Sequence, residues 1–281
     1  MSDYSLNLGF KQLLEIPLAV LKRMSEDRLP RHASSLAFSS LLALAPMMAL
    51  AIAMLSLFAP MEQLGGQVEE FIYQYLVPTA SDDVRHYLDQ FAGQTGKLSL
   101  FGLVFFFLTA LLLLATIESS FNDIWRVKRG RRFTARLTVY WALISLGPLL
   151  MGASLSLSTY FLSLSIFTGQ VQSAGLVLLP WLLMVAAFLV LYLIMPNVRV
   201  VFLHALGGAV VASILFEVTK RGFALYVKNF ANYEVVYGAL STLPIFLLWV
   251  YLSWMIALIG AEVVAVLQIR SQNTSPTITS K

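Results

Sequence analysis

The chain has 281 residues, of which 58% are hydrophobic and only 12% are charged. A soluble domain carries roughly 25% charged residues and about 45–50% apolar ones. This deficit of charge excludes an ordinary soluble globular protein and indicates that a bilayer is the solvent for most of the chain. There is no cysteine, which excludes a disulfide framework and a thiolate metal site.

Long stretches without a charged residue predict the membrane-spanning segments. A helix needs about 20 residues to cross the hydrocarbon layer. The apolar runs therefore predict six such helices, at about 36–58, 98–118, 140–164, 176–195, 204–226 and 240–263. We expect an all-α polytopic membrane protein, with residues 36–270 forming a single six-helix transmembrane domain.

Three segments outside these spans are distinctive. In residues 1–35, apolar residues such as Phe10, Leu13, Leu14, Leu21 and Met24 recur near helical spacing, which predicts an amphipathic helix on the inner leaflet. No cleavable signal peptide is evident there. Residues 60–97 contain two apolar stripes separated by Pro78 and predict a periplasmic helical hairpin between the first two spans. Residues 271–281 are polar and predict a disordered cytoplasmic tail.

The distribution of Lys and Arg predicts the orientation. With the N-terminus inside, the inner segments hold 14 of the 19 basic residues and the outer loops hold 3. This bias follows the positive-inside rule. We therefore expect a bacterial inner-membrane protein with both termini in the cytoplasm.

The fifth predicted span contains a charged cluster. Glu217, Lys220 and Arg221 are at positions i, i+3 and i+4, so they share one helix face. A charged side chain within a membrane span costs about a few kcal/mol unless it is paired or lines a water-filled cavity. The cluster is therefore either a candidate substrate or ion site, or a self-neutralised pair whose basic side chains extend to the outer headgroups.

Glu118 and Glu262 lie at the predicted cytoplasmic ends of the second and sixth spans. They are candidates for a cytoplasmic gate or a proton relay. The alternative is that they are ordinary interfacial carboxylates paired with Arg or Lys. Small residues at intervals of four, such as Ala205, Ala209 and Ser213, predict close helix packing, either within the chain or with a second copy.

A basic run follows the second span and comprises Arg126, Lys128, Arg129, Arg131, Arg132 and Arg136. Such a run could contact nucleic acid, but next to a span it more often follows the positive-inside rule and contacts anionic lipid. We therefore expect an inner-leaflet basic patch with membrane lipids as partners and no nucleic acid.

Enzyme signatures are missing from the sequence. The three histidines, His32, His86 and His204, fall in separate regions of the predicted topology, and no H-E-x-x-H, Walker A or G-x-S-x-G motif is present. We expect no catalytic activity, no cofactor and no metal site.

Several longer motifs carry a family resemblance. They are Ala37-Phe38 through Leu44-Ala45-Pro46, Asn122-Asp123-Ile124-Trp125-Arg126, Gly207-Gly208-Ala209, Leu215-Phe216-Glu217, Lys220 through Tyr226, Tyr237-Gly238, Pro244, Trp249-Val250-Tyr251 and Gly260-Ala261-Glu262. With them the chain resembles, over nearly its whole length, the YihY family of inner-membrane proteins, also called BrkB-like and formerly labelled ribonuclease BN. The resemblance implies six spans but no settled activity, and the family pattern includes Glu217, Lys220, Tyr237, Gly238 and Glu262.

Three functions are consistent with these features. The leading hypothesis is a transporter-like protein for a lipid, another envelope component or an ion. In it, Glu217, Lys220 and Arg221 bind substrate and Tyr237-Gly238 shape the outer entrance, while Glu118 and Glu262 form the inner gate. The alternatives are a non-transporting envelope scaffold with protein partners or a homo-oligomeric state, and a membrane-bound hydrolase or ribonuclease.

Overall fold

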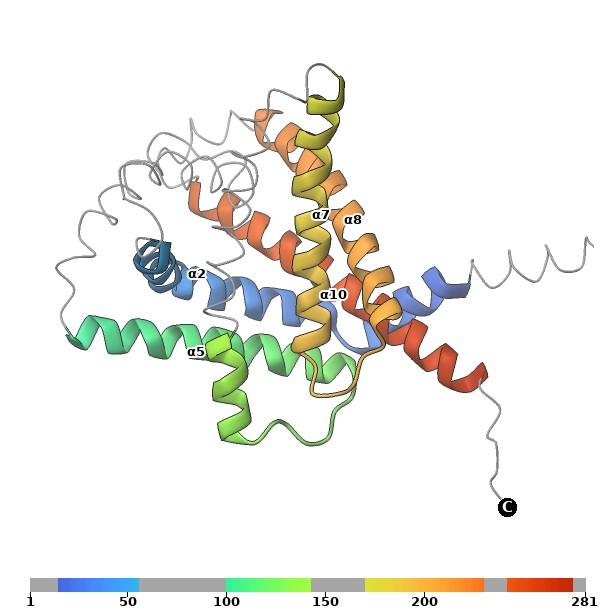
Figure 1. The fold of residues 1–281 in the computed structure, drawn as a ribbon, viewed down its shortest axis with the longest axis horizontal. Helices are drawn as coiled ribbons and strands as arrows, with labels where there is room; N and C mark the ends of the chain where they lie inside the picture. The colour runs from blue at the N-terminus through green and yellow to red at the C-terminus, as the bar shows by residue number, and fades with distance from the viewer. Residues whose placement is uncertain (1–14, 56–99, 143–169, 230–241, 275–281) are drawn as a thin grey trace, which may run out of the picture.

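The computed structural model describes residues 15–55, 100–142, 170–229 and 242–274, and every regular element in these ranges is a helix. The long helices are α2 (Leu29–Leu55), α5 (Leu100–Ile124), α7 (Gln170–Ile194), α8 (Phe202–Asn229) and α10 (Thr242–Thr274). Residues 15–26 and 133–142 are also helical. The prediction of an all-α chain is confirmed for the part that the structure describes (Figure 1).

The helices are longer than the charge-free stretches that predicted them. α2 begins at Leu29 rather than near residue 36, α5 continues to Ile124 rather than ending near 118, and α10 continues to Thr274 rather than ending near 263. Residues 271–274, expected to be part of the disordered tail, are the last turn of α10. Helical hydrogen bonding does not stop where the hydrocarbon stops, so a search for uncharged residues underestimates helix length.

Two of the described helices are long and apolar enough to cross a membrane, at Phe202–Lys228 in α8 and Leu243–Gln272 in α10. Trp181–Ile194 in α7 is a shorter apolar stretch. Of the third predicted span only residues 140–142 are described, and the predicted hairpin at 60–97 lies outside the described residues, as do 275–281. The count of six spans therefore stays a prediction.

The N-terminal helix 15–26 packs its inner face on the rest of the molecule. Val20 is buried and Met24 lies against the core, while Leu18 and Leu21 are exposed. Pro17 is early in this described helix, where a missing backbone N–H does least harm. Val20 and Met24 thus face the protein while Leu18 and Leu21 face outward, and the location of this helix on the inner leaflet stays a prediction.

Several helix ends meet at one side of the molecule, which we call the polar end (Figure 1). α2 and α8 begin there, and α5 and α7 end there. The turn that joins α7 to α8 is fixed to both neighbours, because Asn197 N–H donates to Asn122 Oδ1 at 2.8 Å and Gln268 Nε2 donates to the Arg199 carbonyl at 2.9 Å. Most of the candidate site residues lie at this end.

α8 and α10 pack closely because two glycines face each other. A Cβ on Gly208 would lie 2.2 Å from Val264 Cγ2 and 2.7 Å from the Gly260 carbonyl oxygen. A Cβ on Gly260 would lie 2.1 Å from Tyr192 Oη, which itself donates to the Ala257 carbonyl at 2.9 Å. The predicted ridge of small residues, with Ala205, Ala209, Ala212 and Ser213 fully buried, therefore packs within the chain.

A row of aromatic rings joins the helices, from the last turns of α5 and α7 to the middle of α8. Phe121 of α5 lies 6.2 Å from Tyr192 of α7, and Phe188 of α7 lies 6.3 Å from Phe216 of α8, as ring centroids. Phe216 in turn contacts Trp249 of α10 at 5.4 Å, edge to face. These contacts join four helices through side chains with few rotatable bonds, which favours one fixed helix arrangement.

Candidate functional site

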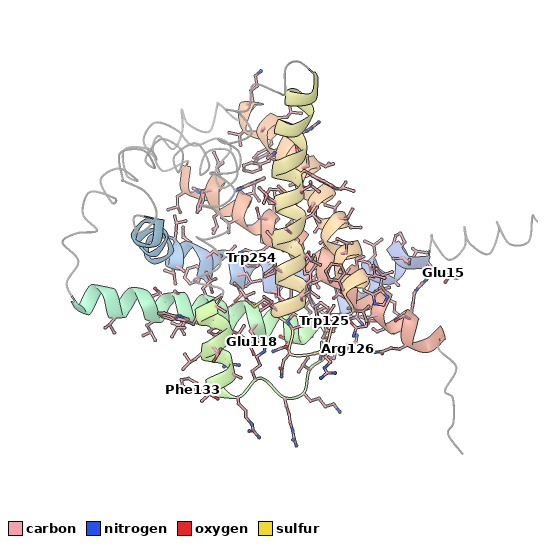
Figure 2. All side chains as sticks on the ribbon, viewed as in Figure 1. Glu15, Glu118, Trp125, Arg126, Phe133 and Trp254 are labelled. Atoms are coloured by element: carbon pink, nitrogen blue, oxygen red, sulfur yellow. The ribbon has the colours of Figure 1, made fainter. Side chains whose placement is uncertain are left out.

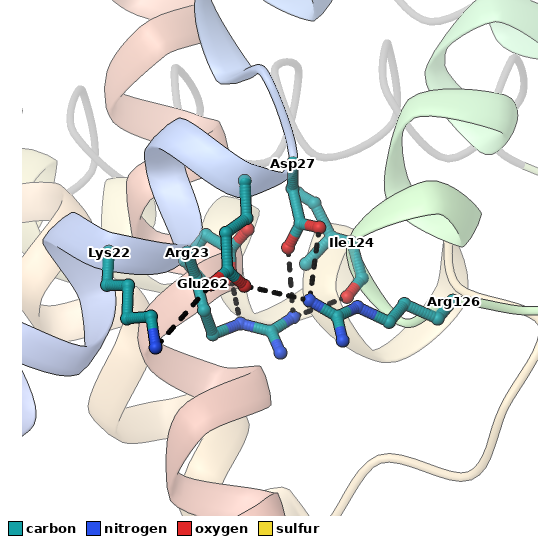
Figure 3. Close-up of polar contacts among 7 residues, drawn as sticks. Lys22, Arg23, Asp27, Ile124, Arg126 and Glu262 are labelled. Carbon is teal, nitrogen blue, oxygen red and sulfur yellow. Dashed lines mark hydrogen bonds and ion pairs between the residues drawn. The ribbon is translucent and has the colours of Figure 1, made fainter.

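Glu262 is one of two fully buried carboxylates at the polar end. Its side chain is fully buried, and it is closed by Arg23 from the N-terminal helix, whose Nε donates to Glu262 Oε2 at 2.7 Å (Figure 3). Nη2 of the same guanidinium donates to the Ile124 carbonyl at 2.6 Å. One arginine thus joins the N-terminal helix, the end of α5 and α10. Glu262 Oε1 is buried and accepts no hydrogen bond within the described residues.

Two acidic residues of the N-terminal helix extend this cluster. Asp27 Oδ2 lies 3.3 Å from Arg23 Nη2, and its Oδ1 lies 3.5 Å from Arg126 Nη2. Arg126 also contacts Glu26 at 3.2 Å. The cluster therefore alternates acidic and basic groups from three segments of the chain, so that each charge in it has an opposite neighbour.

Arg126 reaches this cluster because the backbone turns sharply after α5. It has φ 53°, in the left-handed region that usually belongs to glycine. Val127 N–H donates to the Asn122 carbonyl and Arg126 N–H to the Asp123 carbonyl, both at 2.9 Å. This pair of bonds is the Schellman arrangement that ends a helix. A non-glycine residue at this position gives up some backbone stability and gains the contacts with Glu26 and Asp27.

Glu118 has a separate cluster on the same end of α5. Its side chain is fully buried, and Oε2 accepts from Arg136 Nε at 3.1 Å and from Tyr140 Oη at 2.7 Å. Both donors come from the helix 133–142, and Oε1 is buried without a hydrogen bond in the described part of the chain. Figure 2 shows Glu118 on α5 above the segment that carries Phe133.

The linker between α5 and the helix 133–142 is fastened to the end of α7. Arg131 donates through Nη2 to the carbonyls of Ile194 and Pro196, the latter at 3.0 Å. Asn197 Nδ2 donates to the Arg129 carbonyl at 3.0 Å. A guanidinium at the last carbonyls of a helix satisfies acceptors that have no intrahelical partner and opposes the negative end of the helix dipole.

The predicted basic patch is therefore divided between two roles. Arg126, Arg131 and Arg136 make specific contacts within the protein. Lys128, Arg129 and Arg132 are exposed and have no ion pair among the described residues. Only this second group is placed to meet lipid headgroups without giving up a contact.

The charged face of α8 is paired as the spacing predicts. Glu217 Oε2 lies 2.7 Å from Lys220 Nζ, and Oε1 accepts from Arg221 Nε at 3.1 Å. The Glu217 and Lys220 side chains are partly buried, whereas 77% of the Arg221 side chain is exposed. The three side chains therefore form the pairing that their i, i+3 and i+4 spacing predicts.

The structure does not bring the α8 cluster and the carboxylates of the polar end together. Gly208 lies opposite Gly260 and Val264, which places the start of α8 beside Glu262. Glu217 follows Gly208 by nine residues, or about 14 Å along the helix axis at 1.5 Å per residue. The candidate site and the candidate gate are thus at different levels of the domain. Tyr237 and Gly238, predicted to shape the outer entrance, lie outside the described residues.

Sequence reasoning missed two residues of the polar end, Arg23 and Asp27. Their i, i+4 spacing indicates a local ion pair. Nothing local indicates that Arg23 also reaches α10, because that contact depends on how the N-terminal helix docks. The described residues contain no group of three or more His, Asp or Glu side chains that could hold a metal ion.

The deciding comparison is with protein families. The family model described as virulence factor BrkB matches residues 20–280, which include all five long helices. The chain belongs to the BrkB family. The resemblance drawn from the sequence motifs is thereby confirmed, and the protein is a membrane protein of this family.

Relatives in several bacteria support the assignment. The chain is 41% identical to a UPF0761 membrane protein of Photobacterium profundum, with 97% of this chain and 89% of the relative aligned. It is 41% identical to one of Vibrio vulnificus, over 88% and 80% of the two chains. It is 43% identical to one of Pseudomonas aeruginosa, with 91% of this chain but only 63% of that longer relative aligned. No solved structure matches the chain.

Proposed function

We propose that this BrkB-family protein is a multi-pass inner-membrane transporter for a lipid, another envelope component or an ion, with both termini in the cytoplasm. On this orientation the polar end faces the cytoplasm, and the exposed Lys128, Arg129 and Arg132 lie at the inner leaflet. The proposal includes six spans and the periplasmic hairpin at 60–97. It also includes membrane lipids as partners and no catalytic activity on RNA.

The observation that carries the proposal is a pair of fully buried carboxylates, each of which forms an ion pair with one arginine from outside the long helices. Arg23 closes Glu262 and Arg136 closes Glu118. Buried ionisable groups in membrane helices are costly, and they commonly mark a pathway. Ion pairs between separate segments suit a gate, because two segments that move apart exchange the pair for hydration.

The charged cluster of α8 is a second group of charged side chains, at a different depth in the same domain. Glu217, Lys220 and Arg221 offer both signs of charge within one helical turn. A zwitterionic or charged substrate, or an ion, would exchange with one of these partners. In this proposal the cluster is the binding level and the arginine-closed carboxylates are the cytoplasmic gate.

Flux in proteoliposomes tests the proposal. Wild-type protein should move at least one labelled lipid or ion faster than empty vesicles, and Glu217→Gln and Lys220→Gln should abolish that flux. Lys228→Gln is the matched control, since Lys228 is an exposed basic residue of the same helix. Retained flux in Glu217→Gln would remove the charged site from the proposal.

Arg23→Gln tests the gate separately. If the Arg23–Glu262 pair holds the cytoplasmic end closed, its loss should raise passive leak of the transported species while the protein stays folded. Absence of flux for every lipid and ion tried would favour the envelope scaffold. Stable, stoichiometric protein partners in pull-downs would then be the expected result. Metal-dependent RNA turnover by the purified protein would contradict both.

A further inference from the structure

A polar cleft of about 470 Å³ opens at the polar end, between the end of the N-terminal helix, the first turns of α2 and the last turns of α5. Its basic lining residues are Arg28, Arg31 and His32, and Ser35 and Ser119 add hydroxyls. The cleft shares Glu26 and Asp27 with the Arg23–Glu262 cluster, whereas its other basic and hydroxyl side chains belong neither to that cluster nor to the α8 cluster.

The charge available in this cleft is positive. Its two acidic residues are already ion-paired with basic side chains. Glu26 pairs with Lys22 and Arg126, and Asp27 pairs with Arg23 and Arg126. Arg28 and Arg31 are exposed, and their guanidinium groups have no ion pair within the described residues. Two unpaired guanidinium groups offer up to ten N–H donors and no acceptor, so they favour an oxyanion such as a phosphate group.

Two hydroxyl groups of the wall can donate to a ligand, whereas the His32 ring is held by α5 through Ser120 and lies with Nε2 3.8 Å from Asp123 Oδ2. Ser120 Oγ donates to the Thr116 carbonyl at 2.9 Å, so the His32 Nδ1 atom, 3.2 Å from Ser120 Oγ, is the donor in that contact. The His32 ring is thereby held against α5. Ser35 and Ser119 line the cleft with no hydrogen bond from their hydroxyls among the described residues, which leaves both able to donate.

Beyond the cleft, the same faces of both helices become apolar and exposed. On α2, Ser35 is followed at helical spacing by Phe38 and Leu42, which are 58% and 59% exposed. On α5, each fourth residue back from Thr116 is exposed and apolar, at Leu112, Leu108 and Val104. Residues three and four apart share a helix face. α2 and α5 pack side by side, so the two apolar faces lie along one pair of helices (Figure 1).

The length of the apolar face matches one leaflet. From Thr116 to Val104 is twelve residues, or about 18 Å of helix. One leaflet of hydrocarbon is about 15 Å thick, half of the ~30 Å core. The protein thus presents a cationic cleft with hydrogen-bond donors, followed by an apolar face as long as one leaflet. An anionic phospholipid has the complementary sequence of groups, a negatively charged headgroup followed by acyl chains.

We propose that this cleft binds the phosphate-bearing headgroup of an anionic phospholipid, whose acyl chains lie along the exposed faces of α2 and α5. Arg28 and Arg31 contact the phosphate oxygens, and Ser35 and Ser119 donate to them. The lipid belongs to the leaflet at the polar end. The site does not depend on transport, because a lipid bound here is read out by binding rather than by flux.

Lipid binding to the purified full-length protein tests the site. The protein in detergent is titrated with phosphatidylglycerol, phosphatidylcholine or inorganic phosphate, and bound lipid is counted by native mass spectrometry alongside the unfolding temperature. Phosphatidylglycerol should bind and raise the unfolding temperature, and the other two should do so at least about tenfold more weakly. The Arg28→Gln/Arg31→Gln double variant should weaken phosphatidylglycerol binding about tenfold or more, as expected for lost hydrogen bonds to a charged group.

Arg199→Gln/Lys228→Gln is the matched control, because it removes the same net charge from two exposed residues that lie outside both the cleft and the basic run after α5. It should bind phosphatidylglycerol as the wild type does. Ser35→Trp fills the cleft without a change of charge, so it tests the site even if the double arginine variant fails to fold, and it should weaken binding similarly.

Three results would overturn the proposal. Unchanged phosphatidylglycerol binding in the double arginine variant or in Ser35→Trp would show that the lipid binds elsewhere. An equal loss in the Arg199→Gln/Lys228→Gln control would show a general charge effect. Equal stabilisation by inorganic phosphate would identify a free anion as the ligand and remove the apolar faces from the site.

Discussion

Arg23 and Glu262 are 239 positions apart in the sequence, and 2.7 Å separates their Nε and Oε2 atoms. The contact fastens the N-terminal helix to the last helix of the domain. The two partners depend on it unequally. Arg23 also contacts Asp27 and the Ile124 carbonyl, whereas Glu262 has Arg23 as its ion-pair partner in the described part of the chain.

This inequality predicts different effects for the two single variants. Arg23→Gln leaves the fully buried Glu262 carboxylate unpaired and should lower the free energy of unfolding by about 3 kcal/mol or more. Glu262→Gln leaves Arg23 with Asp27 and the Ile124 carbonyl, and a glutamine oxygen still accepts from Nε, so the loss should be about 1 kcal/mol. Unfolding of the purified proteins in mixed micelles measures both.

Lys22→Gln is the control for this comparison. Lys22 lies next to Arg23, but its side chain is 79% exposed and its pair with Glu26 is 3.7 Å long. An exposed pair of this kind contributes about 0–1 kcal/mol. If Arg23→Gln were no more destabilising than Lys22→Gln, the N-terminal helix would not be docked as described.

The Glu118 cluster gives an analogous prediction within the basic run. Arg136→Gln should destabilise the protein by about 3 kcal/mol, because the buried Glu118 carboxylate keeps only the hydrogen bond from Tyr140. Arg132→Gln removes the same charge from an exposed side chain and should change stability by less than about 0.5 kcal/mol. Thermal unfolding of the two variants side by side is the measurement, and equal midpoints would contradict the Glu118 contact.

These clusters also show which parts of the molecule could be predicted from the sequence. Apolar runs predicted a helix at each described span, because a long stretch without charged residues indicates a segment that lies in an apolar environment. The helices extend beyond the predicted spans, by up to eleven residues at Thr274, since helical hydrogen bonding continues into water. The ion pair of Glu217 with Lys220 and Arg221 followed from spacing alone, because an α-helix fixes the distance between i, i+3 and i+4.

The partners of Glu262 and Glu118 required the tertiary structure. The sequence indicated only that such carboxylates pair with some Arg or Lys. The selection of Arg23 depends on where the N-terminal helix docks, and the selection of Arg136 depends on the turn after α5. Neither ion pair is indicated by a sequence motif or by a regular spacing of residues. The small residues of α8 predicted close packing, but the facing of Gly208 with Gly260 needed both helices in place.

The backbone at Arg126 can be tested by comparing two substitutions that lose the same side-chain contacts. Arg126→Ala and Arg126→Gly both lose the ion pairs with Glu26 and Asp27. Only glycine adopts φ near 53° without steric cost. The glycine variant should therefore be more stable than the alanine variant by about 1 kcal/mol. Equal unfolding temperatures would mean that residue 126 is not left-handed in the folded protein.

The last prediction concerns the contact of α8 with α10, and the chain provides its own control on α8. Gly208→Ala places a Cβ 2.2 Å from Val264 Cγ2 and 2.7 Å from a backbone oxygen, so the helices must separate, and the cost should be about 1–3 kcal/mol. Gly222→Ala meets nothing within 4 Å and should stabilise the helix by up to about 1 kcal/mol. The same exchange on one helix thus has opposite signs. Unfolding temperatures that fall for Gly208→Ala and rise for Gly222→Ala would confirm the close packing, and a rise for both would show that α8 and α10 are further apart.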